Sequence, residues 1–125
     1  MNLERIDHFA ITVKDVQASA DWYSRVFGFE IIHRFTHTFF IGHKTIRIGL
    51  MSRPDATPID DLNNKIAFQH AAFLTDAAGL EQAQIALSAA SIPFDGPEDT
   101  GIAFSIFVTD PDGHQLEITS YHKTT

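Results

Sequence analysis

The 125-residue chain contains no cysteine, which excludes disulfide bonds and any reaction that needs a thiolate. It also has no apolar run near the ~20 residues that a membrane-spanning helix requires. Its first residues, Met-Asn-Leu-Glu-Arg-Ile-Asp-His, turn polar at once and do not form the apolar core of a signal peptide. We therefore expect a cytoplasmic protein that does not insert into a membrane.

Basic residues are few. Nine Lys and Arg stand against sixteen Asp and Glu, which gives a formal charge of −7 at pH 7. No cluster of Lys and Arg supplies the positive surface that a nucleic-acid backbone requires, so nucleic acid is not an expected partner. Apolar residues make up 44% of the chain and include eleven phenylalanines. This composition is typical of a folded protein that is long enough to bury a core.

Two segments of the chain begin in the same way, with a histidine on a predicted strand that leads into a predicted helix. The first has a strand over 6–13 and a helix from 16 to about 27; the second has a strand over 68–74 and a helix from 78 to about 90. An Asp or Thr before each helix suits an N-cap, and apolar residues recur within each helix at helical spacing. The pattern indicates an internal repeat.

Short strand-like runs follow each predicted helix. The expected strands are 29–33, 38–41 and 45–51 in the first half, and 92–94, 102–109 and 115–121 in the second. Residues 52–65 are polar and contain two prolines, which is typical of a linker. We predict an α+β fold in which two βαβββ modules form a curved mixed-sheet cleft. Residues 1–125 would then be one domain of two repeats, about 4–51 and 66–121, joined by the linker 52–65.

The two repeated histidines are predicted to face the cleft. Side chains alternate between the two faces of a strand, so His8 shares a face with Ala10 and Thr12. The opposite face of that strand is more apolar and should pack against a helix. His70 has the equivalent place in the second repeat. Two imidazoles are therefore expected at matching positions on matching strands.

A carboxylate on the last strand is the third candidate. Asp110-Pro111-Asp112-Gly113 is a strong turn signal, and the alternation after it puts Glu117 on the less apolar face in mid-strand. A carboxylate there is costly unless it is solvated, paired or bound to a cation. Singly, each of these residues is most often structural or solvated. Their joint placement favours one divalent metal (Fe, Mn, Zn, Ni or Co) at His8, His70 and Glu117.

These residues resemble the vicinal oxygen chelate superfamily of glyoxalases, extradiol dioxygenases and bleomycin-resistance proteins. The resemblance covers about residues 4–121, and its most specific part is Asp-Pro-Asp-Gly-His-Gln-Leu-Glu. It implies a glyoxalase/dioxygenase-like fold, metal at His8, His70 and Glu117, a small-molecule substrate and a homodimer. It also implies bidentate chelation of a small oxygen-rich or anionic metabolite by a lyase, isomerase or dioxygenase, with Glu117 taking part in catalysis.

The chain departs from each enzyme type within that superfamily. Members similar to glyoxalase I carry a glutamate on the last strand of the first half, where this chain has Gly49. Ring-cleaving dioxygenases and fosfomycin-resistance transferases usually show a tyrosine ten residues before the final glutamate, where this chain has Phe107. The ring-cleavage pattern also expects a histidine near residues 98–100, which are Glu-Asp-Thr here. The reaction therefore stays open.

Arg47 is the second catalytic candidate, because the alternation of its strand turns it toward the cleft. A guanidinium there suits a substrate carboxylate or phosphate; the alternative is a surface or interface ion pair. His33 and His37 are candidates for a base, whereas His43 and His114 are expected to be solvent-exposed. Two other functions stay open: a metal-free drug-binding protein of the bleomycin-resistance type, and a member that keeps its metal for stability alone.

Overall fold

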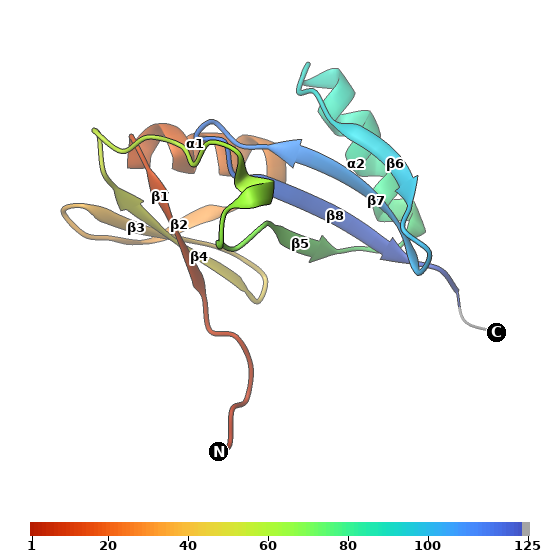
Figure 1. The fold of residues 1–125 in the computed structure, drawn as a ribbon, viewed down its shortest axis with the longest axis horizontal. Coiled ribbons are helices and arrows are strands. Elements are labelled where there is room, and N and C mark those ends of the chain that lie inside the picture. The colour runs from red at the N-terminus through yellow and green to blue at the C-terminus, as the bar shows by residue number, and fades with distance from the viewer. Residues whose placement is uncertain (124–125) are drawn as a thin grey trace. The chain divides into compact units, whose positions relative to one another are not determined.

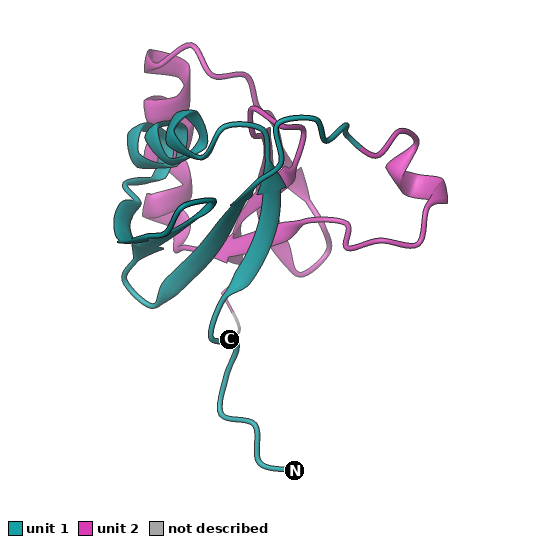
Figure 2. Cartoon of the chain, turned by 90° about the vertical axis from the view of Figure 1, so that its left-hand side faces the viewer, with its two compact units in different colours: residues 1–58 teal, residues 59–125 magenta. Residues whose placement is uncertain are grey.

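Two βαβββ repeats make up the fold in the computed structural model, which describes residues 1–123. The chain divides into two units, Met1–Pro58 and Ile59–Thr125 (Figure 2). Their sheets have the strand orders β1-β4-β3-β2 and β5-β8-β7-β6, which are the same order once the second repeat is renumbered (Figure 1). The predicted α+β fold of two βαβββ modules is confirmed. Within residues 1–123, no helix is long and apolar enough to cross a membrane.

Unit 1 contains the first of these sheets. β1 (Phe9–Val13) leads into α1 (Val16–Phe27), which is followed by β2 (Glu30–Arg34), β3 (Thr38–His43) and β4 (Ile46–Ser52). β4 lies inside the sheet, parallel to β1 and antiparallel to β3, and β2 pairs with the other side of β3. The parallel β1–β4 pair requires a crossover connection, and α1 is part of it.

The bounds of α1 follow from its capping residues. The Asp15 carboxylate accepts a hydrogen bond from the Ala18 N–H at 3.0 Å, which satisfies one of the unpaired donors at the helix start. Gly28 ends the helix in the left-handed conformation, with φ 79°, that glycine adopts without steric cost. Tyr23 is fully buried, and its ring meets that of Phe29 edge-on at 5.9 Å. The apolar side of α1 therefore packs on its own sheet.

Unit 2 repeats this arrangement. β5 (Ala71–Leu74) leads into α2 (Ala77–Ala89), which is followed by β6 (Asp95–Asp99), β7 (Ala103–Thr109) and β8 (Gln115–Tyr121). β8 lies inside the sheet, parallel to β5 and antiparallel to β7. α2 packs against β7 and β8 and covers one face of the sheet (Figure 1).

The core of each unit lies on the helix-covered face of its sheet. Alternate residues of the inner strands are buried there, whereas most residues between them are more exposed; Gly49, Ala103 and Ser105 are the buried exceptions. The buried apolar side chains on these faces include Ile48 and Leu50 in β4, Ile106 and Val108 in β7, and Leu116 and Ile118 in β8. The predicted apolar faces are thus the ones that pack on helices, and the opposite faces carry the candidate functional residues.

The prediction of a strand over 92–94 is wrong. These residues come directly after α2, and the Ile92 N–H donates back to the Leu87 carbonyl at 2.9 Å, closing the end of the helix. The strand is β6, whose sequence Asp-Gly-Pro-Glu-Asp has no large apolar side chain and which lies at the edge of its sheet, paired with β7. All five residues of this edge strand are exposed, so neither face packs in the core and the strand carries no apolar alternation.

Candidate metal centre and adjoining pocket

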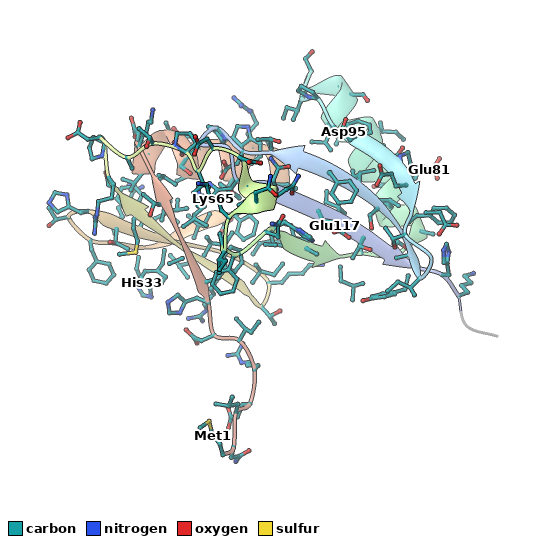
Figure 3. All side chains as sticks on the ribbon, viewed as in Figure 1. Met1, His33, Lys65, Glu81, Asp95 and Glu117 are labelled. Atoms are coloured by element: carbon teal, nitrogen blue, oxygen red, sulfur yellow. The ribbon has the colours of Figure 1, made fainter. Side chains whose placement is uncertain are left out.

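Glu117 lies in the middle of the face of the unit 2 sheet that is opposite α2, hereafter the site face. The register pairs Glu117 with Ala72 of β5 on one side and Phe107 of β7 on the other. Its chain neighbours Leu116 and Ile118 are buried on the helix side. Figure 3 shows Glu117 where β5 and β8 run side by side. The strand alternation therefore places the carboxylate as the sequence predicts.

His70 lies directly before β5 and contacts this carboxylate. Its Nε2 atom is 3.1 Å from Glu117 Oε1, with side-chain exposures of 43% for His70 and 14% for Glu117. Nitrogen and oxygen ligands about 2.0–2.2 Å from one metal ion, and at right angles to each other, are about 3 Å apart. The spacing of the two atoms thus fits two adjacent ligands of one divalent ion.

The second oxygen of Glu117 is held by a buried serine. Ser105 Oγ lies 2.8 Å from Glu117 Oε2 and 2.9 Å from Thr119 Oγ1, and its residue is 0% exposed. A hydroxyl has a single proton, so Ser105 donates to the carboxylate and accepts from Thr119. Sequence reasoning missed both hydroxyls. The sequence contains a pattern that could have identified them: a polar residue at 105 interrupts an apolar strand, and Thr119 shares the face of Glu117.

His8 belongs to unit 1 and lies directly before β1. Its Nδ1 is 2.8 Å from Asp7 Oδ2, and its ring meets Phe40 edge-on at 5.1 Å. The pKa of Asp7 is lowered, chiefly by this hydrogen bond and also by the positive charge of Arg47. With the proton on Nδ1, the Nε2 atom keeps a lone pair, which is the usual arrangement of a metal-binding histidine backed by a carboxylate.

The predicted site residues thus fall in both units. His70 and Glu117 lie together in unit 2, and His8 and Arg47 belong to unit 1, where Arg47 is exposed on β4. Taking each unit by itself, and within residues 1–123, no three His, Asp or Glu side chains form a metal-binding group. His8, His70 and Glu117 as metal ligands, and Glu117 and Arg47 as catalytic residues, stay predictions.

Gly49 is the unit 1 counterpart of Glu117. In unit 1 it pairs with Ala10 of β1 and Phe40 of β3, just as Glu117 pairs with the corresponding residues of β5 and β7. A Cβ added at Gly49 would lie 3.4 Å from both Ala10 Cβ and the Phe40 ring. The position therefore has no carboxylate, and a side chain added there would be in van der Waals contact with both neighbours.

His33 and His37, the two candidate bases, are both exposed in unit 1. His33 lies on β2, and its ring is 6.3 Å from that of Phe35 and 6.4 Å from that of Phe40. The expectation that His43 is solvent-exposed is wrong: it is half-buried at the end of β3, with its ring 5.8 Å from Phe29. Gly42 and His43 belong to the strand itself, so the turn begins later than the sequence suggests.

The expectation that His114 is solvent-exposed is also wrong. Its side chain is 28% exposed, and its Nδ1 lies 2.8 Å from Oδ2 of Asp110, whose side chain is 0% exposed. The same carboxylate accepts hydrogen bonds from the backbone N–H groups of Asp112 at 3.0 Å and His114 at 2.8 Å. The turn before β8 is therefore built around a buried carboxylate. Hydrogen bonding to Asp110 raises the pKa of His114.

The His114–Asp110 pair makes the stability of the chain depend on pH. The pKa of folded His114 lies above its ordinary value of 6.5, so its contribution is full below that value and is lost as pH rises through the raised pKa. We expect His114→Asn to lower the free energy of unfolding by about 1 kcal/mol more at about pH 6 than at about pH 9. Urea unfolding at both pH values measures this. An equal loss at the two pH values would contradict a charged pair.

A pocket of about 440 Å³ adjoins His70, and every residue that lines it belongs to unit 2. Its lining residues are Asp61, Leu62, Asn63, Gln69, His70, Phe107 and Gln115. Part of the lining comes from the predicted linker, which contains the short 3₁₀ helix η1 (Leu62–Asn64). The Gln69 side-chain amide donates to the Leu62 carbonyl at 3.4 Å and so ties the linker to the segment before β5.

Comparisons with known proteins agree with this fold. A family model described as the Glyoxalase/Bleomycin resistance protein/Dioxygenase superfamily matches residues 5–118. Virulence protein STM3117 of Salmonella typhimurium is 27% identical over 131 residues, covering 97% of this chain and 87% of that protein.

Two solved structures share the fold at low sequence identity. The glyoxylase/bleomycin resistance protein/dioxygenase domain from Frankia sp. EAN1pec superposes with a TM-score of 0.83 at 19% identity, covering 99% of this chain and 96% of that one. The genomically encoded fosfomycin resistance protein FosX from Listeria monocytogenes has a TM-score of 0.77 at 18% identity, covering 97% and 94%.

Proposed function

The chain belongs to the Glyoxalase/Bleomycin resistance protein/Dioxygenase superfamily, and on that premise we propose that it is a divalent-metal-dependent enzyme. It acts as a lyase, isomerase or dioxygenase on a small oxygen-rich or anionic metabolite, which binds the metal through two neighbouring oxygens. The metal is Fe, Mn, Zn, Ni or Co, held by His8, His70 and Glu117. The observation that carries the proposal is the 3.1 Å contact between His70 Nε2 and Glu117 Oε1 on the site face.

The donor set fits this chemistry. Two neutral imidazoles and one carboxylate leave a divalent ion with a net charge of +1 and with open coordination positions. Such an ion attracts anionic oxygens and polarises the bonds next to them as a Lewis acid. The Asp7–His8 hydrogen bond supports His8 as a ligand, because it orients the imidazole and holds the proton on Nδ1, away from Nε2.

Two residues are proposed to transfer a proton and to bind the substrate. Glu117 is the candidate to accept a substrate proton, because its carboxylate lies beside the proposed metal and is oriented by Ser105. The equivalent position in unit 1 is Gly49, so the repeat supplies no second carboxylate for the acid–base chemistry of glyoxalase I. Arg47, exposed on β4, is proposed to hold a negatively charged oxygen of the substrate.

The protein is further proposed to be a cytoplasmic homodimer. Several large apolar side chains of unit 2 are exposed in the single chain, among them Phe68 and Leu74 beside or on β5. Large exposed apolar side chains lose contact with water when a partner covers them, and we propose a second copy of the chain as that partner.

Acetohydroxamate, a small neutral ligand with two neighbouring oxygens, tests the proposal. Elemental analysis of untreated protein should find about one divalent ion per chain. In calorimetric titration, acetohydroxamate should bind the metal-loaded protein and should not bind the protein after chelator treatment. Its O-methyl derivative, which cannot chelate through both oxygens, is the matched control and should bind neither form.

Two outcomes would overturn the enzyme proposal. Equal binding of acetohydroxamate and its O-methyl derivative to metal-free protein would favour the drug-binding alternative. Absence of binding by acetohydroxamate to protein that carries the metal would remove bidentate chelation as its chemistry.

A further inference from the structure

The pocket beside His70 has an uneven charge pattern. Its lining contains one carboxylate, Asp61, the side-chain amides of Asn63, Gln69 and Gln115, and the ring of Phe107. Among the described residues that line it, none is a lysine or an arginine. The formal charge of the whole chain, −7, has the same sign as that of Asp61. The lining of the pocket thus offers hydrogen-bonding groups and negative charge, but no lysine or arginine.

The linker holds the carboxylate in place. Asp61 lies directly before η1 with φ 54° and ψ 54°, and both its carboxylate oxygens accept from Asn64 Nδ2 at 2.9 Å. A carboxylate has about four lone-pair sites, so a ligand can still donate to it. Gln69 uses a side-chain N–H on the Leu62 carbonyl, which leaves its own carbonyl oxygen as an acceptor. Two residues of the lining, Asp61 and Gln69, thus keep acceptor capacity for a ligand.

The pocket lies beside the proposed metal site. His70 lines it directly, and Phe107 pairs in register with Glu117 across β7 and β8. Gln115 precedes Glu117 by two residues on β8 and therefore shares its face of the sheet. The volume of about 440 Å³ lies within the roughly 300–1,000 Å³ usual for small-molecule sites. A substrate that chelates the metal with one end has room here for its other end.

We propose that this pocket receives the end of the substrate that does not bind the metal, and that this end is a hydrogen-bond donor without negative charge: an amine, an amide or a hydroxyl. The inference rests on the proposed function, because the metal fixes the chelating end. An anionic end would lose its water beside Asp61 without a countercharge, whereas a donor gains a partner. An anionic group contacted by Arg47, a residue of unit 1, would be a different part of the substrate.

This inference is tested with three hydroxamates of equal chain length. They differ only in the group at the far end, which is an ammonium, a carboxamide or a carboxylate. Each is titrated calorimetrically into the full chain loaded with Mn(II). We expect the ammonium and carboxamide compounds to bind about tenfold more tightly than the carboxylate compound, as about 1.4 kcal/mol of discrimination corresponds to tenfold. O-methylated versions of all three report binding that does not use chelation.

Asp61→Asn tests the negative charge of Asp61 alone, because the amide oxygen of the new side chain can still accept a hydrogen bond from Asn64. The ammonium compound should lose its advantage over the carboxylate compound by several-fold, while the carboxamide compound changes little. Asp60→Asn is the matched control, because it removes the same charge from the adjacent exposed residue, which does not line the pocket. It should leave the order of the three affinities unchanged.

The outcomes separate this inference from the proposed function. Equal affinities for the three compounds, or tightest binding of the carboxylate compound, would overturn the inference and leave metal chelation intact. Equal effects of Asp60→Asn and Asp61→Asn would also overturn it, since they would show a response to net charge alone. Failure of all three compounds to bind Mn(II)-loaded protein would overturn both.

Discussion

The Glu117→Ala protein is expected to bind its divalent ion at least about a hundredfold more weakly than the parent chain. Loss of a hydrogen-bond partner behind a metal ligand already costs about 10–100-fold, and loss of the ligand itself costs more. The substitution also removes the only anionic ligand in the proposed set. His70→Ala should have a similar effect, because its Nε2 lies 3.1 Å from the same carboxylate. Elemental analysis and Mn(II) titration of the purified proteins measure both effects.

Glu98→Ala is the matched control for this loss. Glu98 is an exposed carboxylate on β6 of the same sheet, and β7 lies between β6 and the strand of Glu117. Its removal changes the net charge by the same amount and should leave the metal affinity within about twofold, since surface charges interact weakly. A His70→Ala protein with the metal content of the parent chain would show that the ligands are assigned wrongly.

The elements that alternation and capping define could be predicted from the sequence. The alternation of apolar and polar residues over 115–121 predicted the face of Glu117, and the burial of every second residue in β8 agrees with it; Asp15 predicted the start of α1. β6 could not be predicted in the same way. It is a polar edge strand, so its position depends on pairing with β7 and leaves no apolar periodicity in its own sequence.

The site was only partly predictable for a related reason. The likeness of the two repeats pointed to Gly49 as the counterpart of Glu117, and the strand register agrees. The hydrogen bond from Ser105 to Glu117 depends on which residues of β7 and β8 lie opposite each other. That register cannot be predicted from the sequence alone. The burial of His114 likewise depends on Asp110, whose carboxylate points into its own turn.

The hydroxyl pair behind Glu117 leads to the second large prediction. Ser105→Ala should lower the affinity for a divalent ion by about 10–100-fold, the usual cost of losing a hydrogen bond to a metal ligand. The serine hydroxyl donates to Glu117 Oε2 at 2.8 Å, while Oε1 lies toward His70. Without it, the carboxylate can rotate and must be reoriented when the ion binds. Mn(II) titration of the variant and the parent chain measures the change.

Thr119 distinguishes orientation of the carboxylate from a general effect on folding. Thr119→Val removes the hydroxyl that donates to Ser105 at 2.9 Å and should weaken metal binding by less than Ser105→Ala does. Thr119→Ser keeps that hydroxyl and should retain nearly the parent affinity. We expect the effects of Ser105→Ala, Thr119→Val and Thr119→Ser on metal affinity to decrease in that order. The reason is that Ser105 can still donate its hydrogen bond to Glu117 when Thr119 is changed.

Ser120→Ala controls for the loss of a buried hydroxyl. Ser120 is 5% exposed and lies on the opposite face of β8 from Glu117, so its removal tests the sheet without touching the carboxylate. Both serine variants are expected to lower the free energy of unfolding, by about 1–3 kcal/mol where a buried partner is left unsatisfied. Only Ser105→Ala should also weaken metal binding. An equal loss of affinity in Ser120→Ala would mean that metal binding follows stability, and that Ser105 has no orienting role.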